Sequence, residues 1–368
     1  MAKELTESQP GIPVETWLSI FEREYLAEYV PAGGAAVKVV SGTPAALHHL
    51  KCGVEALASE RKMRYSLLDA GKFDAAGKKP DLHRMDKFFF AATAGLDWKG
   101  AAASQARQFL LSRGIQIRPG RQLNDLAGIA ADNERAPQEL ENEYRLELAN
   151  QQMRDYGMAI EFRTAITTLG RMQITPNAFA PATEEVILDW LSGRATPGAA
   201  SALKRIQIYE RIHQTNARFM LASLCRWLPN IGLNGLILTL DFRPYEYKKI
   251  PKGQRQAQEN RKLNDAIARG ATAEELAELQ AGFDKEPDIT YTEAAYMQML
   301  ALVRRFIDET DWFERFALII LTTPAYYDAL SRRNYNNYDA LQTRIGLEVR
   351  DANRANPTAT LVHLEDAL

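Results

Sequence analysis

Apolar positions in the N-terminal part of the chain follow the period of a helix in some segments and that of a buried strand in others. Residues 13–30 place large apolar side chains near a 3.6-residue period, which predicts a helix that Pro31 ends. A β-branched run predicts a strand at Ala35–Val40, and a helix at Ala45–Glu60 and a strand at Tyr65–Asp69 follow. This alternation is typical of an α/β sheet with parallel strands.

The middle of the chain has a helical pattern. Residues from Lys87 to about Gly170 are largely helical in pattern, with one charge-rich helix predicted over Gln138–Glu161. A further helix is predicted over Pro181–Leu191, and a long one over Ser201–Leu228. These segments predict a large helical part of the molecule.

Two continuous apolar runs predict central strands in the C-terminal half, because burial on both faces removes the alternation of polar and apolar residues. They lie at Gly232–Asp241 and Phe316–Thr322, and Thr358–Leu364 is a third strand candidate. Between the first two, residues 257–282 predict a polar helical hairpin and Thr292–Glu309 a helix.

These elements predict a division of the chain. We expect an N-terminal half of an α/β domain at residues 1–85, a helical insertion at 86–200 and the C-terminal half of the α/β domain at 201–368. A smaller polar insertion is expected near 250–285. The strands at 37–40 and 236–240 are expected to be neighbours in one sheet.

The turn after the first strand has the strand–loop–helix layout of a nucleoside-triphosphate P-loop. A P-loop needs G-x-x-x-x-G-K-[ST], whose glycines, lysine and hydroxyl bind the phosphates and Mg²⁺. Here the small-residue turn Ser41–Ala46 reads S-G-T-P-A-A, and the second glycine, the lysine and the hydroxyl are missing. One alignment places His48 and His49 at the lysine and hydroxyl positions, and a shifted one places Ala46–Leu47 there.

Composition adds few constraints on function. With 46% hydrophobic residues, 25% charged residues and a net charge of −2, the chain gives no global electrostatic reason to bind nucleic acid or an anionic membrane. Cys52 and Cys225 are far apart and lack C-x-x-C spacing, so we expect reduced thiols. The polar N-terminus and the absence of a long apolar stretch predict no secretory signal and no membrane span, hence a cytoplasmic protein.

Several segments, taken in order, resemble the C/D family of ATP-binding proteins from bacteriophage exclusion (BREX) systems, which are P-loop ATPases of prokaryotic phage defence. The segments are G-G-A-A-V-K-V-V-S-G at Gly33–Gly42, W-L-S-G at Trp190–Gly193, N-A-R at Asn216–Arg218, G-L-N-G-L…D at Gly232–Asp241, Arg305–Asp308, Thr322–Pro324 and Tyr338–Arg344. The resemblance implies an α/β P-loop NTPase fold of AAA+-like type, a parallel sheet flanked by helices. It also implies a role in antiviral defence.

The chain departs from this family where catalysis takes place. The phosphate loop lacks its lysine, and Asp241 is followed by Phe242 where the family has a glutamate that polarises the attacking water. Losing such a group costs on the order of 10²–10³ in rate. The sequence therefore predicts a pseudo-ATPase without catalytic residues, whose vestigial nucleotide site would comprise Gly42, Thr43, His48, His49 and Asp241.

No cofactor or metal is expected, although ATP or ADP with Mg²⁺ stays an alternative. Asp241 could hold Mg²⁺ or have a structural role, and Glu246 could replace the missing acid. Adjacent histidines on a helix point about 100° apart, so His48 and His49 do not suit one metal ion.

Two groups of cations could serve partners. Arg333, paired in sequence with Arg332, and Arg344 are candidates for arginines that reach a neighbouring subunit's nucleotide. The basic segment 243–256, with Tyr245 and Tyr247, could bind DNA through phosphate contacts and stacking. Its cations are Arg243, Lys248, Lys249, Lys252 and Arg255.

Three functions therefore follow from the sequence. The first is a silent structural or regulatory subunit of a defence complex, beside other protein subunits such as an active ATPase paralogue or further copies of itself. The second is an ATPase with an atypical phosphate loop, and the third is a nucleic-acid-binding subunit.

Overall fold

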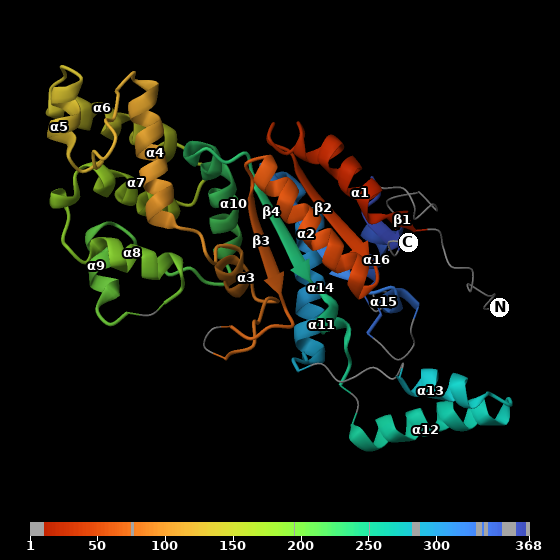
Figure 1. The fold of residues 1–368 in the computed structure, drawn as a ribbon. Helices are drawn as coiled ribbons and strands as arrows, with labels where there is room; N and C mark the ends of the chain where they lie inside the picture. Colours follow the sequence, from red (N-terminus) through yellow and green to blue (C-terminus); the bar gives the residue numbers. More distant parts are fainter. Residues whose placement is uncertain are drawn as a thin grey trace.

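The computed structural model contains one parallel sheet flanked by helices (Figure 1). It describes residues 11–74, 77–194, 196–249, 251–281, 288–328, 333–334, 338–347 and 358–365. The sheet is 6-stranded in the order β1-β6-β2-β5-β4-β3, and every pairing is parallel. The strands are β1 (Ile12–Pro13), β2 (Ala35–Ser41), β3 (Arg64–Asp69), β4 (Leu236–Asp241), β5 (Phe316–Thr322) and β6 (Leu361–Glu365). The predicted α/β fold class is confirmed, and the architecture is consistent with a P-loop NTPase-like fold.

The expected adjacency of β2 and β4 is wrong. The two strands share the sheet, but β5 lies between them and pairs with both. All residues of β4 and β5 are buried, as the continuous apolar runs predict for strands covered on both faces. The most apolar strand of the C-terminal half therefore occupies the middle of the sheet.

One face of the sheet is covered by the N-terminal helices. These are α1 (Val14–Phe21), the π-helical turn η1 (Glu22–Leu26) and α2 (Pro44–Glu60). Trp17, Leu47 and Leu50 from these helices share a core with Val40 and Ile319 of the sheet. The apolar period of α2 thus aims one side of the helix at the sheet and leaves the other side exposed.

The opposite face carries the larger core. It is covered by α3 (Met85–Ala92), α10 (Ala217–Trp227) and α14 (Glu293–Asp308). Phe88, Trp227 and Phe306 from these helices lie in one cluster with Leu238 and Ile320 of the sheet.

A helical part extends from the β3 side of the sheet (Figure 1). Its further elements are α4 (Trp98–Ser112), α5 (Leu126–Asp132), α6 (Pro137–Leu148), η2 (Ala149–Met153), α7 (Ile160–Ile174), η3 (Pro176–Ala178), α8 (Thr183–Leu191) and α9 (Ala199–Arg205). Its outer part has its own core, which includes Phe109 and Tyr144. The helical insertion is present as predicted, and the domain limits at residues 85 and 200 stay predictions.

Two long helices predicted in this region are wrong. The segment 138–161 contains α6 and η2, and α7 begins only at Ile160, because Asp155 accepts the backbone N–H of Gly157 and forms a turn between them. The segment 201–228 is interrupted between α9 and α10. Gln207 has a φ of +65°, outside the helical range, and Asn216 Oδ1 accepts the N–H of His213 just before α10.

The polar hairpin extends away from the sheet (Figure 1). It consists of α12 (Lys252–Ala268) and α13 (Ala273–Ala281), as predicted for this segment. The short elements are η4 (Leu228–Ile231), α11 (Arg243–Glu246), η5 (Thr310–Trp312), α15 (Ala325–Asp328), α16 (Asp339–Gln342) and η7 (Thr343–Leu347).

Candidate functional site

The carboxyl ends of three central strands meet at one edge of the sheet. In register, Ser41 of β2 lies beside Thr322 of β5, and Asp241 of β4 lies beside Leu321. After β2 the chain enters α2 on one face, whereas after β5 it passes through α15 and α16, whose Tyr326 and Leu341 belong to the core of the other face. Such a switch point is where α/β sheets bind ligands, so a nucleotide would be sought here.

The connection between β2 and α2 consists of Gly42 and Thr43 alone. Gly42 N–H donates to Thr322 O at 3.3 Å, Thr43 Oγ1 accepts the N–H of Ala46 at 3.3 Å, and Pro44 has no N–H. The six-residue turn predicted over Ser41–Ala46 is therefore wrong, because Ser41 ends the strand and Pro44 begins the helix. A phosphate loop needs a longer turn whose backbone N–H groups face the ligand, and this connection does not provide one.

His48 and His49 lie on the exposed side of α2 and contact other helical residues. His49 Nε2 is 2.7 Å from Glu15 Oε1, and His48 Nε2 is 3.9 Å from Cys52 Sγ. Neither of these contacts is made with the strand ends, so the structure does not bring the two histidines together with Asp241.

Asp241 is 3% exposed and is held by two cations. Arg243 donates to it twice, from Nε to Oδ1 at 2.7 Å and from Nη2 to Oδ2 at 2.5 Å. Lys51 Nζ is 3.8 Å from Oδ2. The sequence analysis missed this lysine. The helical period does indicate its direction, because Lys51 follows the inward-facing Leu47 by four residues and so lies on the same side of α2.

These contacts determine what Asp241 can bind. Both of its carboxylate oxygens accept hydrogen bonds from Arg243, and that pairing raises the pKa of the guanidinium. Mg²⁺ needs carboxylate oxygens of its own and is repelled by nearby cations. The residues present therefore do not fit a magnesium ion at Asp241 in this arrangement.

Glu246, the candidate replacement for the missing acid, is fully buried. Its Oε1 accepts the N–H of Thr323 at 2.9 Å, and its Oε2 accepts the Thr323 hydroxyl at 2.5 Å. These bonds tie α11 to the end of β5, and they leave the carboxylate away from solvent.

The two candidate trans-acting arginines are engaged within their own chain. Arg333 is 4% exposed and donates to the carbonyls of Tyr245 and Tyr291 at 3.1 and 2.8 Å. Arg344 Nε donates to Asp308 Oδ1 at 2.6 Å. Arg332 lies outside the described residues. A role for Arg333 or Arg344 at a neighbouring subunit stays a prediction that requires these contacts to change.

The basic segment is only partly exposed. Lys248 and Lys249 are exposed, whereas Arg243 is paired with Asp241. Lys252 and Arg255 begin α12, and their side chains lie outside the described part of the chain.

Tyr245 does not suit the stacking role expected for it. It is fully buried and stacks on Tyr291 with ring centroids 3.7 Å apart, and burial raises its pKa. DNA binding by this segment stays a prediction that would depend on its lysines.

The shared sequence blocks have structural explanations. Gly193 ends α8 with a φ of +69°, and a Cβ there would meet the ring of Phe90 at 2.5 Å. A Cβ on Gly235 would meet Arg315 O at 2.6 Å, so this position requires glycine where β4 begins beside β5. Arg218 pairs with Glu309. These residues position helices and strands.

Two C-terminal blocks that are distant in sequence meet in the structure. Asp308 of α14 accepts from both Arg304 at 2.9 Å and Arg344 at 2.6 Å, and Arg304 Nη1 donates to Tyr338 Oη at 3.3 Å. Both arginines hold the pKa of Asp308 below its usual range, although its partial burial opposes them. The network attaches the segment after β5 to α14.

Within the described ranges, no group of three or more His, Cys, Asp or Glu side chains could hold a metal ion. No helix in the same part of the chain combines the length and apolarity that crossing a membrane requires.

Comparison with known proteins gives one family. A search of curated proteins found no match, and a search of solved structures found none. One segment of the chain matches a family model. This segment includes the blocks at 190–193, 216–218 and 232–241, and it excludes the β2–α2 connection. Residues 120–276 match the model of the family described as BREX system ATP-binding protein BrxC/D, so the resemblance seen in the sequence is confirmed over this part of the chain.

Proposed function

We propose that the chain is a catalytically silent subunit of a prokaryotic BREX defence complex, acting in the cytoplasm as a structural or regulatory protein. The observation that carries the proposal is the two-residue connection Gly42–Thr43, together with the pairing of Asp241 to Arg243 and Lys51. Phosphoryl transfer depends on positioned N–H groups, a lysine and Mg²⁺. At this connection Gly42 N–H donates within the protein and Pro44 has no N–H. The carboxylate that would hold Mg²⁺ is already paired with two cations.

The remaining architecture supports a scaffold role. The sheet and both covering layers fold around buried cores, so a surface that binds other proteins can exist without the chemistry. A partner would then be another protein of the complex, an intact ATPase paralogue or a second copy of this chain.

Turnover is the first test. The purified chain should hydrolyse ATP with Mg²⁺ no faster than the Asp241→Ala variant, which serves as a blank that lacks the strand-end carboxylate. A rate that exceeds the blank by tenfold or more would contradict the proposal and favour an ATPase with an atypical phosphate loop.

Association is the second test. The chain, co-expressed with the other proteins encoded beside its gene, should co-purify with at least one of them in a stoichiometric complex that does not require ATP. Purification of the chain alone, with all those proteins present and folded, would oppose a subunit role.

A further inference from the structure

A cavity of about 730 Å³ lies in the helical insertion, outside the sheet edge described above. It is formed by α6 and η2, α7, the segment after η3, and α8 and α9. Arg145 of α6, Arg171 of α7 and Arg205 of α9 all line it. Three arginines from three different helices therefore share one hollow.

The lining of this cavity contains no aspartate or glutamate among the residues described. Its polar side chains besides the arginines include the hydroxyls of Thr164, Thr167 and Thr168. In the described part of the chain, none of the three arginines has a carboxylate within ion-pair distance. Arg145 and Arg205 are exposed and Arg171 is partly buried, so all three cations are accessible to an anion from solvent.

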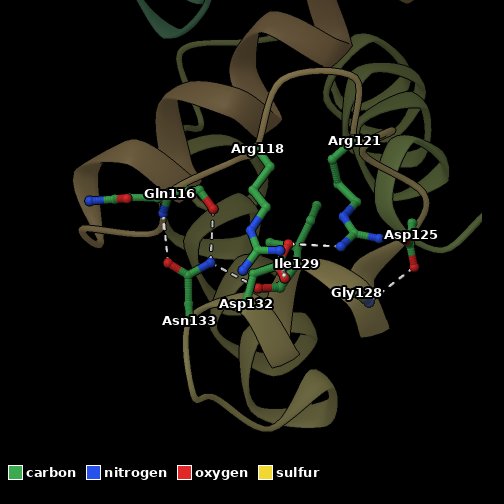
Figure 2. A network of polar contacts seen from close by, with 8 residues as sticks. All are labelled: Gln116, Arg118, Arg121, Asp125, Gly128, Ile129, Asp132 and Asn133. Carbon is green, nitrogen blue, oxygen red and sulfur yellow. Dashed lines mark hydrogen bonds and ion pairs between the residues drawn. The ribbon is translucent and has the colours of Figure 1, made fainter.

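Arginines elsewhere in the same insertion are arranged differently. Figure 2 shows Arg118 and Arg121 directed at Asp132, with Nη–Oδ distances of 3.2 and 2.8 Å. Arg121 also contacts Asp125, which in turn caps α5 through Gly128 N–H. These two arginines thus have carboxylate partners, which the cavity arginines lack among the described residues.

One of the three is also held in position. The guanidinium of Arg171 lies 5.1 Å from the ring centroid of Phe179, which also lines the cavity. Stacking on an aromatic ring orients the planar fork of arginine and leaves its N–H groups available at the edge. Such a fork binds phosphate oxygens in pairs.

We propose that this cavity binds a small ligand that carries two or more phosphate groups. The arginines neutralise the phosphates, whereas the hydroxyls of Thr164 and Thr167 already donate to Ile160 O and Gln152 Oε1. The volume lies in the range of about 300–1,000 Å³ typical of small-molecule pockets. A local open hollow with three cations suits a compact polyanion better than a long nucleic-acid strand, which needs a continuous basic track.

The proposal is independent of the silent strand-end site, because the two lie on different elements. Anion binding in the insertion requires neither Mg²⁺ nor Asp241.

Isothermal titration calorimetry with sodium tripolyphosphate, in low salt with EDTA, tests the proposal. We expect saturable binding, weakened about tenfold or more in Arg171→Met and in Arg205→Met, because each removes a charge-assisted contact. Arg107→Met is the matched control, since Arg107 is exposed on α4 and does not line the cavity. Unchanged circular dichroism spectra establish that the variants fold.

Two outcomes would overturn it. Absence of saturable binding, or equal weakening in all three variants, would mean that the arginines form no site. Binding of a 20-nucleotide single strand that depends on Arg171 and Arg205, without binding of tripolyphosphate, would replace the small ligand with nucleic acid.

Discussion

Individual side chains at the strand ends decide the interpretation of this molecule. Asp241 could be identified from its place after an apolar run, and its burial was expected. Its partners could not be identified. Lys51 lies 190 residues earlier in the sequence, and a helical period predicts which side of the helix a residue faces but not which residue it contacts. The same limit applies to Glu246, whose bonds to Thr323 depend on where α11 turns.

The Asp241–Arg243 pair should be needed for stability. Arg243→Ala leaves a 3% exposed carboxylate with Lys51 alone, and we expect the free energy of unfolding to fall by about 1–3 kcal/mol. Urea denaturation measures it. Adding Asp241→Asn to this variant should recover part of the lost free energy of unfolding. If the loss in the double variant equals the sum of the losses in the two single variants, the pair does not interact.

Lys38 of β2 predicts a dependence of stability on pH. Burial lowers its pKa from 10.5 to about 8, and its Nζ donates to Tyr25 Oη at 2.7 Å and to Thr358 O at 2.5 Å. Between pH 8 and 10.5 the unfolded chain holds a proton that the folded chain lacks. The free energy of unfolding should therefore gain a positive slope with pH in this window.

The Lys38→Met variant isolates that contribution. Urea midpoints at pH 7.5, 8.5 and 9 should rise less with pH in the variant than in the parent chain, since groups that do not contact Lys38 titrate equally in both and Tyr25, which does, stays protonated over this range. Parallel curves would mean that the folded-state pKa of Lys38 is not lowered.

Elements with strong periodic patterns were the most predictable. The strands β2 to β6 and the helices α2 and α14 match the predicted ranges to within a few residues, because each is buried against the sheet, whereas the short strand β1 was not predicted. The helices predicted over 138–161 and 201–228 failed, because the chain is non-helical over 154–159, where Gly157 donates to Asp155, and over 206–216, where Gln207 has a positive φ. Residue composition alone does not reveal such turns.

The side chain of Thr43 caps the N-terminus of α2 and should contribute to stability. Thr43→Ala removes the acceptor for Ala46 N–H and should lower the free energy of unfolding by about 1 kcal/mol. Thr43→Ser keeps the hydroxyl and should stay close to the parent in a thermal melt. Equal melting temperatures for alanine and serine would indicate that the hydroxyl does not cap the helix.

The polar hairpin should be dispensable for folding. Among the described residues, α12 and α13 mainly contact each other and extend from the sheet (Figure 1). Replacing residues 252–281 with a short glycine–serine linker should change the melting temperature by only a few degrees. A large drop would reveal contacts that stabilise the sheet.

At the scale of the whole molecule, the parallel sheet was predictable and its strand order was not. Strand candidates follow from local patterns, whereas the placement of β5 between β2 and β4 depends on which strands bury both faces. The central claim also belongs to this scale. The strand ends meet as they would around a nucleotide, but the two-residue connection offers no phosphate loop and the paired Asp241 offers no ligand for Mg²⁺.

Titration of a fluorescent ATP analogue with and without Mg²⁺ tests this claim most directly. We predict no Mg²⁺-dependent binding, and identical curves for the parent chain and the Asp241→Ala variant. Any Mg²⁺-independent binding should instead be weakened about tenfold or more by Arg171→Met, which separates the insertion cavity from the strand ends. Micromolar, Mg²⁺-dependent affinity that Asp241→Ala abolishes would contradict the account.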